Sequence, residues 1–417
     1  MALSMFGRWA TKAIGIGQPW ALRTFSNPHF ERIPTGQLLE EETLRDYLAT
    51  RYYPVRIGEV LASRYQVVGK VGFGATSTVW LARDLIGRRH IALKVFISSS
   101  SLHRDEQSRE LTAYQRLERG PVSHPGRQAI RTLLDSFIVA GPDGEHQCLV
   151  HPPLFDSVYG FLARNPIGRL PTPVLAVVLR QVLRALEYAR LCEIIHTDIS
   201  AANVMFGIDD PSVFEKFEQA EIETPTARKE LEDRIIYSSR SLETPHRLGL
   251  PVLSDFGAYM SGKELHTSDV QPDIYRSPEV ILQVPWSYEI DIWNVGCMIL
   301  DIFEDRHLFY GTDPEHGVYR SRAHLAEMIA LLGPPPPTLL ERASARAKFF
   351  NGQGVFNAGI EVPPRFTLDQ LVTGVEGSDK ELFLRFMGKM LQWDPKDRHT
   401  AQQLLEDEWL RKHTADA

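Results

Sequence analysis

The chain has 417 residues, 43% of them apolar and 24% charged, and a formal net charge of -7, which suits a globular protein with a sizeable core. Its three cysteines, Cys148, Cys192 and Cys297, are widely spaced and form no C-x-x-C pair, which argues against a disulfide framework or a zinc site and for a reducing compartment. No apolar run approaches the roughly 20 residues of a membrane span, so we expect a soluble protein without a membrane partner.

Charge is distributed unevenly along the chain. Residues 1–154 carry 19 Lys and Arg against 14 Asp and Glu, whereas residues 155–417 carry 27 against 39. The acidic second part does not suggest direct binding of nucleic acid, but it would attract a basic peptide. Ordinary solubility charge explains the same excess, so composition alone leaves both interpretations open.

Residues 1–30 form a basic tail without any Asp or Glu, and its basic residues include Arg8, Lys12 and Arg23. Five apolar residues of this tail would share one helical face: Phe6, Trp9, Ala10, Ala13 and Ile14. The pattern is typical of a mitochondrial presequence, and a disordered tail is the alternative. Residues 31–64 form an extension that we expect to pack on the domain that follows.

A glycine-rich turn lies between two predicted strands. Arg64–Val68 predicts the first strand, and Gly69–Leu81 contains the turn, with Gly72 and Gly74, and the second strand. Glycines allow backbone N–H groups to approach phosphate oxygens. Ser77 stands where a third glycine would complete G-x-G-x-x-G, and the strand–turn–strand context opposes the strand–turn–helix of a dinucleotide site.

A single lysine, Lys94, interrupts the apolar strand predicted over Ile91–Phe96. A buried ammonium group is costly unless it is paired, and an exposed, snorkelling lysine is the alternative. The helix predicted over Arg104–Arg119 offers Glu110 as the partner, with Glu106 as the runner-up. We favour Glu110 because Leu111, Tyr114 and Leu117 can supply an apolar face beside it.

Cys148–Val150 predicts the last strand of this first part of the chain, followed by the connection His151-Pro152-Pro153-Leu154. The two prolines stiffen the connection. A strongly apolar helix, predicted over Pro173–Leu191, then leads to the stretch that organises the chain.

That stretch is Ile194–Phe206, in which H-T-D-I-S-A-A-N lies between two apolar runs. It predicts a short loop between buried segments. Such a loop can aim the carboxylate of Asp198 at a substrate hydroxyl and the amide of Asn203, five positions later, at a metal ion.

Residues 207–251 form a polar insertion, which we expect to be a loop or short helices on the surface rather than a new core domain. The predicted strand that follows, Val252–Ser254, ends in Asp255-Phe256-Gly257, and Asp255 is a candidate metal carboxylate.

Three further motifs lie in the last third of the chain or just before it. Ile274–Glu279 reads I-Y-R-S-P-E, Asp291 lies on an otherwise buried helix, and Arg398 ends the motif D-P-K-D-R. Asp291 is either an N-cap or an acceptor that orders the backbone of the loop around Asp198. Arg398 is a candidate partner for Glu279, although an isolated Arg is usually a surface residue.

Taken in order, these motifs make residues 65–410 resemble a eukaryotic protein kinase. Four features are similar to the SR-protein kinases of the CMGC group, in particular their compact fungal branch. They are Thr197 before Asp198, the sequence G-A-T-S-T-V-W-L-A-R-D, the sequence Y-R-S-P-E-V-I-L and a short insertion after Phe206. The resemblance implies an α+β, bilobal fold. Its lobes would be a small β-rich N-lobe at 65–154 and a larger, mainly helical C-lobe at 155–411, which includes the insertion at 207–251 and is followed by a tail at 412–417.

The resemblance also implies the cofactors ATP and Mg²⁺ and the roles of the site residues. Asp198 would be the catalytic base, Asn203 and Asp255 would hold the metal, and Lys94, fixed by Glu110, would hold phosphates. Adenine would bond the carbonyl of Pro152 and the N–H of Leu154, with His151 as gatekeeper. The remaining nucleotide contacts would come from the glycine-rich region and the neighbouring strands: Val71, Gly72, Phe73, Gly74, Ala75, Ser77, Val79 and Ala92.

The substrates implied are Arg/Ser-rich proteins such as splicing factors, which the acidic stretch 251–319, with 12 Asp and Glu against 3 Lys and Arg, would suit. We expect a monomer that regulates mRNA splicing in the cytoplasm and nucleus, or a mitochondrial protein if residues 1–30 are a presequence. The family implies independence from phosphorylation of the activation segment, since Thr197 replaces the Arg that would bind the phosphate.

Two departures from the family pattern keep an alternative open. Ser200 replaces the lysine that normally neutralises charge on the transferred phosphoryl group, and loss of such a charge costs on the order of 10²–10³ in rate. Ser77 in the glycine-rich loop is a milder change. A pseudokinase that binds nucleotide or an Arg-rich partner without turnover is therefore the second hypothesis, and a small-molecule kinase is a distant third.

Overall fold

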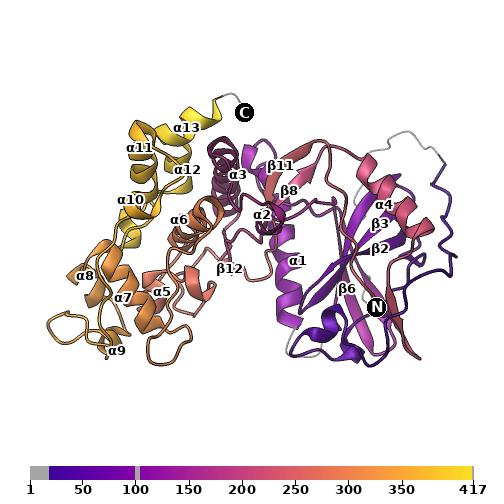
Figure 1. The fold of residues 1–417 in the computed structure, drawn as a ribbon, viewed down its shortest axis with the longest axis horizontal. Coiled ribbons are helices and arrows are strands. Elements are labelled where there is room, and N and C mark those ends of the chain that lie inside the picture. Colours follow the sequence, from indigo (N-terminus) through magenta and orange to yellow (C-terminus); the bar gives the residue numbers. More distant parts are fainter. Residues whose placement is uncertain (1–17, 99–103, 416–417) are drawn as a thin grey trace, which may run out of the picture.

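The computed structural model describes residues 18–98 and 104–415, with the backbone alone for 104–108, and it has two lobes. Figure 1 shows a sheet-rich lobe on the right and a helical lobe on the left. The apolar residues predicted for a presequence helix (Phe6 to Ile14) lie outside the described residues, and so does the side chain of Glu106. The three cysteines are buried and free, as expected.

The small lobe is built on an antiparallel sheet of six strands in the order β1-β2-β3-β4-β6-β5. These strands are β1 (Val60–Leu61), β2 (Tyr65–Phe73), β3 (Ser77–Asp84), β4 (Arg89–Phe96), β5 (Asp135–Gly141) and β6 (Gly144–His151). Helix α1 (Arg104–Arg119) is the element of this lobe that faces the helical lobe (Figure 1). The glycine-rich turn joins β2 to β3, as the sequence predicted.

The large lobe is organised around two long buried helices, α3 (Thr172–Leu191) and α6 (Glu289–Glu304). Both are apolar on most of their surface, which is expected of helices that other elements surround. The other helices of this lobe are α2 (Val158–Arg164), α5 (Pro278–Ile281), α7 (Ser321–Leu332), α8 (Pro337–Glu341), α9 (Arg346–Phe349), α10 (Leu368–Leu371), α11 (Gly377–Gly388), α12 (Ala401–Leu405) and α13 (Glu408–Thr414). No helix in the described part of the chain is long and apolar enough to cross a membrane.

Two short antiparallel ribbons lie at the junction of the lobes. Strand β7 (Ile194–Ile195) pairs with β12 (Met260–Ser261), and β8 (Val204–Ile208) pairs with β11 (Leu248–Leu253). The loop between β7 and β8 carries Asp198, and the segment between β11 and β12 carries Asp255. Because the two strands that flank the first loop pair with the two strands that flank the second, the loops lie side by side.

The N-terminal extension packs on the small lobe, as predicted. It contains two short 3₁₀ helices, η1 (Glu40–Thr43) and η2 (Ala49–Arg51). Further upstream, the backbone N–H of Trp20 donates to the carbonyl of Leu85 at 2.8 Å, and Arg23 pairs with Glu218 at 2.6 Å.

The insertion at 207–251 corrects a prediction. It holds helix α4 (Ser212–Glu223) and the hairpin of β9 (Arg228–Glu230) and β10 (Ile235–Tyr237), so it is no separate domain. However, Val213, Phe214 and Phe217 of α4 are buried against Val68 and Leu81 of the small-lobe sheet. The segment thus forms a short helix with an exposed face and no core domain of its own, as expected, but it packs on the small lobe rather than on the large lobe to which the sequence assigned it.

The polar composition concealed this packing because several charged residues of the insertion are themselves buried and paired. Glu218 contacts Arg83 at 3.2 Å and His90 at 3.1 Å, and Glu221 contacts Arg240 at 3.0 Å. A charged residue can be buried when it has a partner of opposite charge, so a count of charged residues does not identify a solvated loop here.

Candidate active site

The loop between β7 and β8 is held in a strained conformation by a buried carboxylate. Thr197 has a φ of +68°, a left-handed value that is uncommon for a β-branched residue. Asp291 of α6 accepts hydrogen bonds from the backbone N–H groups of His196 at 2.7 Å and Thr197 at 2.8 Å. The second of the two sequence interpretations of Asp291 is therefore confirmed, since this residue orders the loop backbone.

His196 is fixed as a neutral imidazole. Its Nε2 lies 3.1 Å from the carbonyl of Ser254, and its Nδ1 lies 3.2 Å from the backbone N of Asp198. A carbonyl can only accept and an N–H can only donate, so the proton must be on Nε2. Burial lowers the pKa of His196 to about 4, which keeps the ring uncharged.

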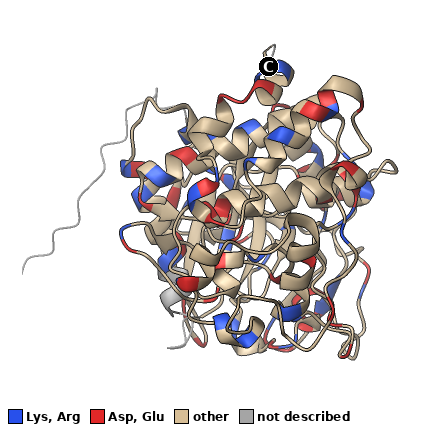
Figure 2. Cartoon of the chain, turned by 90° about the vertical axis from the view of Figure 1, so that its left-hand side faces the viewer, with Lys and Arg blue, Asp and Glu red and all other residues tan. Residues whose placement is uncertain are grey.

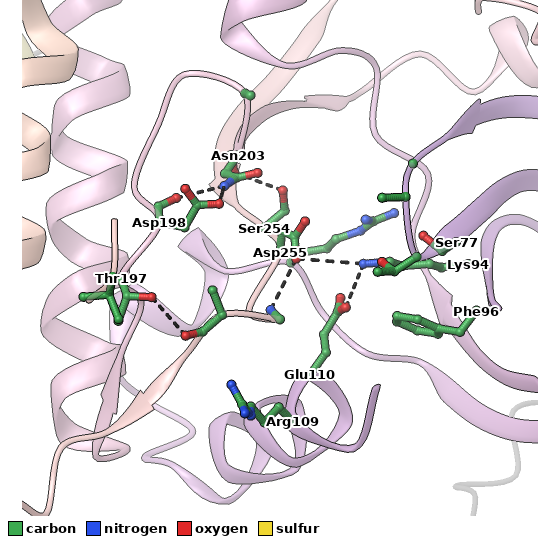
Figure 3. A pocket seen from close by; sticks show the side chains of 18 of the residues that line it. Ser77, Lys94, Phe96, Arg109, Glu110, Thr197, Asp198, Asn203, Ser254 and Asp255 are labelled. Atoms are coloured by element: carbon green, nitrogen blue, oxygen red, sulfur yellow. Dashed lines mark hydrogen bonds and ion pairs between the residues drawn. The ribbon is translucent and has the colours of Figure 1, made fainter. Parts of the chain in front are cut away.

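Asp198 and Asn203 face each other across the loop (Figure 3). The side-chain Nδ2 of Asn203 donates to the backbone carbonyl and to Oδ2 of Asp198, both at 2.8 Å. Burial raises the pKa of Asp198 to about 6, with the charge of Asp255 adding to the effect and the bond from Asn203 opposing it. Asp198 is thus a carboxylate at neutral pH with unusually high proton affinity, as a general base requires.

Lys94, Glu110 and Asp255 form a triangle of charges. Nζ of Lys94 lies 2.7 Å from Oε2 of Glu110 and 3.9 Å from Oδ1 of Asp255 (Figure 3). Burial alone would lower the pKa of Lys94, but the carboxylate of Glu110, and then that of Asp255, raise it, so the lysine is charged. The predicted pair of Lys94 and Glu110 is confirmed.

Three rings in edge-to-face contact, which the sequence did not predict as a unit, connect this triangle to the loop. Tyr114 of α1 lies 5.6 Å from Phe256, and Phe256 lies 4.8 Å from His196, measured between ring centroids. Edge-to-face contact is one of the geometries that aromatic pairs favour. The three rings pack helix α1, the Asp255 segment and the Asp198 loop together.

The charged groups of the triangle, together with Asp198 and Asn203, line one cavity of about 900 Å³ between the lobes. Its walls include most of the predicted site residues: Phe73, Gly74, Ala75, Ser77, Val79, Lys94, Glu110, Asp198, Asn203 and Asp255. Five predicted nucleotide contacts do not line it, namely Val71, Gly72, Ala92, Pro152 and Leu154. Strand β6 ends at the buried His151, so Pro152 and Leu154 do lie in the connection between the lobes.

Arg131 is a wall residue that the sequence analysis missed. Its backbone N–H donates to the carbonyl of Leu253 at 2.9 Å, which places it beside the strand that precedes Asp255. Its guanidinium forms no ion pair with any described residue, although it adds positive charge near Glu110 and Asp255. The only sequence signal was an arginine inside the apolar stretch from Ile130 to Leu134.

The cavity suits a nucleotide and a divalent cation. A Cβ at Gly74 would meet no atom of the described residues within 4 Å and its φ is not positive, so neither their packing nor conformation requires glycine there. Close approach of a ligand to the backbone is the remaining reason. For the cation, the carboxylate of Asp255 and Oδ1 of Asn203, to which no described residue donates, are the hard oxygen ligands that Mg²⁺ takes.

The predicted pair of Glu279 and Arg398 is also in place, whereas the lysine that is missing at Ser200 has no replacement among the direct partners of Asp198 in the described part of the chain. Arg398 forms a bidentate pair with Glu279 at 2.6 and 2.7 Å, and both side chains are fully buried. Ser200 puts no charge beside Asp198, and within the described residues no Lys or Arg forms an ion pair with Asp198. The missing lysine is therefore not replaced by a direct partner.

Comparisons with known proteins agree on one family. A family model for the protein kinase domain matches residues 242–410. A serine/threonine protein kinase of Aspergillus fumigatus is 40% identical over 93% of this chain and 95% of its own length. The serine/threonine-protein kinase SRPK of Physarum polycephalum is 30% identical over 89% of this chain and 91% of its own. A crystal structure of a kinase domain, 23% identical, superposes with a TM-score of 0.66 over 86% of this chain and 99% of that one, which confirms the predicted two-lobed fold.

Proposed function

Because the chain belongs to the protein kinase family, as a serine/threonine protein kinase similar to the SR-protein kinases, we propose that it uses ATP and Mg²⁺ to phosphorylate serine in Arg/Ser-rich proteins such as splicing factors. The observation that carries the chemistry is the convergence of Lys94, Asp198, Asn203 and Asp255 on one cavity. The same convergence weighs against a pseudokinase.

Asp198 orients the serine hydroxyl and takes its proton as the serine oxygen forms a bond to the terminal phosphorus of ATP, while the bond from that phosphorus to the bridging oxygen breaks and ADP leaves. Its raised pKa suits this transfer, and the two bonds from Asn203 fix the carboxylate. Because no covalent enzyme intermediate is needed, positioning and charge stabilisation account for the catalysis.

Bound ATP and its metal ion supply the phosphoryl group and neutralise charge that develops on it. Asp255 and Asn203 would hold the metal, while Lys94, held by Glu110, would hold phosphate oxygens. Pro152 and Leu154 would bond adenine with their backbone, and the glycine-rich turn would cover the phosphates.

A second cavity, of about 560 Å³, supports the choice of substrate. Ala201 of the catalytic loop lines it, and so do the acidic residues Asp301 and Asp305, the aromatic residues Tyr159 and Tyr310, and the basic residues Arg306 and His307. Asp305 is exposed and forms no ion pair with a described residue. A carboxylate beside aromatic rings suits a guanidinium group, which pairs with the one and stacks on the other.

Charge at the end of the molecule that faces the viewer in Figure 2 gives no comparable preference. Figure 2 shows acidic and basic residues interspersed over the helices and loops of the end that faces the viewer. Recognition of arginine would therefore depend on local sites such as this cavity. The relative from Physarum is named SRPK, which is consistent with the same substrate class.

The test compares three peptides in which serine alternates with arginine, lysine or alanine. We expect kcat/KM to be highest for the arginine peptide, and Asp305→Asn to lower it about five- to tenfold for that peptide, the effect of one exposed charged contact. Glu408→Gln, which changes an exposed carboxylate on α13, is the matched control and should have no effect. Equal rates with the arginine and alanine peptides would refute the substrate class.

We also propose that the protein acts as a monomer in the cytoplasm and nucleus. The basic, acid-free composition of residues 1–30 supports the mitochondrion as the alternative. Microscopy of a chain tagged at its C-terminus, with and without residues 1–30, distinguishes the two: mitochondrial signal that requires these residues would overturn the first location.

A further inference from the structure

The N-terminal extension contacts the strand and the turn that form the nucleotide loop. We propose that residues 39–53 are part of the nucleotide site, and that Glu41 and Tyr52 are positioning residues for the glycine-rich loop. The proposal concerns ATP binding and does not depend on the identity of the protein substrate.

The first contact joins the extension to a buried lysine of β2. Lys70 is 0% exposed and lies just before the glycine-rich turn. Its ammonium group pairs with Glu41 and with Glu40, the latter at 3.3 Å, and donates to the carbonyl of Tyr237 at 3.1 Å. Both carboxylates belong to η1 of the extension, and no other described carboxylate pairs with Lys70. Since an unpaired buried ammonium is unstable, β2 depends on the extension for its electrostatic balance.

Lys70 in turn contacts a wall of the cavity. Its Nζ lies 5.3 Å from the ring centroid of Phe73, within the range of a cation–π interaction. Phe73 lines the nucleotide cavity at the end of β2. A shift of Lys70 would therefore reach the loop through two directly connected side chains.

The second contact is at the turn itself. The buried phenol of Tyr52 donates to the carbonyls of Gly74 and Ala75, at 3.4 and 3.3 Å. Both residues line the cavity. A hydrogen bond of this length, shared between two carbonyls, is weak. It still restrains the turn, which has little packing of its own, because a Cβ at Gly74 would contact no described atom.

The insertion holds the extension in this position. Lys229 of β9, 2% exposed, pairs with Glu42 and donates to the carbonyl of Gln37 at 2.7 Å. Arg234 donates to the carbonyls of Ala49 and Tyr52. Extension, insertion and glycine-rich loop thus form one connected unit, which gives the insertion a role in nucleotide binding.

The experiment measures the Kd for ATP with Mg²⁺ by titration calorimetry, and the thermal midpoint, for the full chain and three variants. Tyr52→Phe removes one hydroxyl and should weaken ATP binding about threefold to tenfold, the range that one net hydrogen bond spans. Glu41→Gln removes the nearest charge partner of Lys70 and should weaken binding about tenfold or more. Asp313→Asn is the matched control, because it removes the charge from a buried ion pair, that of Asp313 with Arg322 at 2.5 Å, which lies outside the extension, the insertion and the wall of the cavity.

A merely structural role makes a different prediction. Glu41→Gln and Asp313→Asn would then lower the thermal midpoint alike, and the Kd for ATP would stay within twofold of the original protein in every variant. That result would overturn the proposal. If Glu41→Gln does not fold, Tyr52→Phe decides alone: a weakened Kd at an unchanged thermal midpoint supports the proposal, and an unchanged Kd contradicts it.

Discussion

Replacement of Asp291 by asparagine should uncouple the catalytic loop from the helix that supports it. The carboxylate meets two backbone N–H groups, those of His196 and Thr197, with one oxygen each. An amide of the same shape has one oxygen and one NH₂ group. Asp291→Asn therefore leaves one N–H without an acceptor, facing another donor, in a fully buried site.

The size of the effect follows from the geometry. A hydrogen bond to a charged group contributes about 1.5–3 kcal/mol, and a buried donor left unsatisfied costs about 1–3 kcal/mol. The left-handed Thr197 stores strain of about 1–3 kcal/mol, which the loop would release by moving once its N–H is free. We expect a loss of about 2–4 kcal/mol in stability. Since Asp198 follows Thr197 directly and a displacement of about 1 Å costs roughly 10²-fold in rate, we expect kcat to fall by about that factor.

The assay measures kcat, the KM for ATP and urea unfolding. It is run at about pH 8, because burial raises the pKa of Asp291 to about 7 and the carboxylate must be charged in the original protein. Asp407→Asn is the control: Asp407 is also buried and accepts the N–H of Trp409 at 2.9 Å, but that N–H belongs to α13 and not to the loop that carries Asp198. Loss of stability in both variants with kcat unchanged in both would refute the role of Asp291.

Three further predictions concern other parts of the molecule. The kcat/KM should fall about tenfold from its plateau to about pH 5, since the pKa of Asp198 is about 6 and protonation removes the base; a flat profile would contradict that role. Ser200→Lys should raise turnover about tenfold or more by restoring a cation beside the transferred group, whereas unchanged turnover would mean that another cation of the cavity, such as Arg131, already serves. Phe217→Ala should cost about 3–5 kcal/mol in urea unfolding because the ring is buried against β2, whereas a surface segment would lose less than about 0.5 kcal/mol.

The residues of the active site were accessible to sequence reasoning because the chemistry restricts their types and order. Any fold that uses these residues has to bring them together: Lys94 in a strand, Asp198 and Asn203 on one loop, and Asp255 after a later strand. The pair of Glu279 and Arg398 could also be predicted, but only from the motifs S-P-E and D-P-K-D-R, because Arg398 lies among polar residues in the sequence and would otherwise be expected at the surface.

The packing of the insertion could not be predicted in the same way. Val213, Phe214 and Phe217 indicate a helix with one apolar face, but periodicity does not tell which surface that face covers. Lys70 illustrates the same limit. A lysine on a strand is usually exposed, and its buried state depends on Glu41, which lies 29 positions earlier, and on Tyr237, which lies 167 positions later.

The most direct measurement is transfer of labelled phosphate from ATP to a peptide of Arg-Ser repeats by the original protein and by Asp198→Ala. Asp198 forms no ion pair with a described residue, so its removal should leave the fold intact, which the thermal midpoint can verify. We predict labelling of serine by the original protein and a loss of at least about 10²-fold in the variant. Equal labelling by the two proteins, or none by either, would contradict the assignment of Asp198 as the base of an active serine kinase.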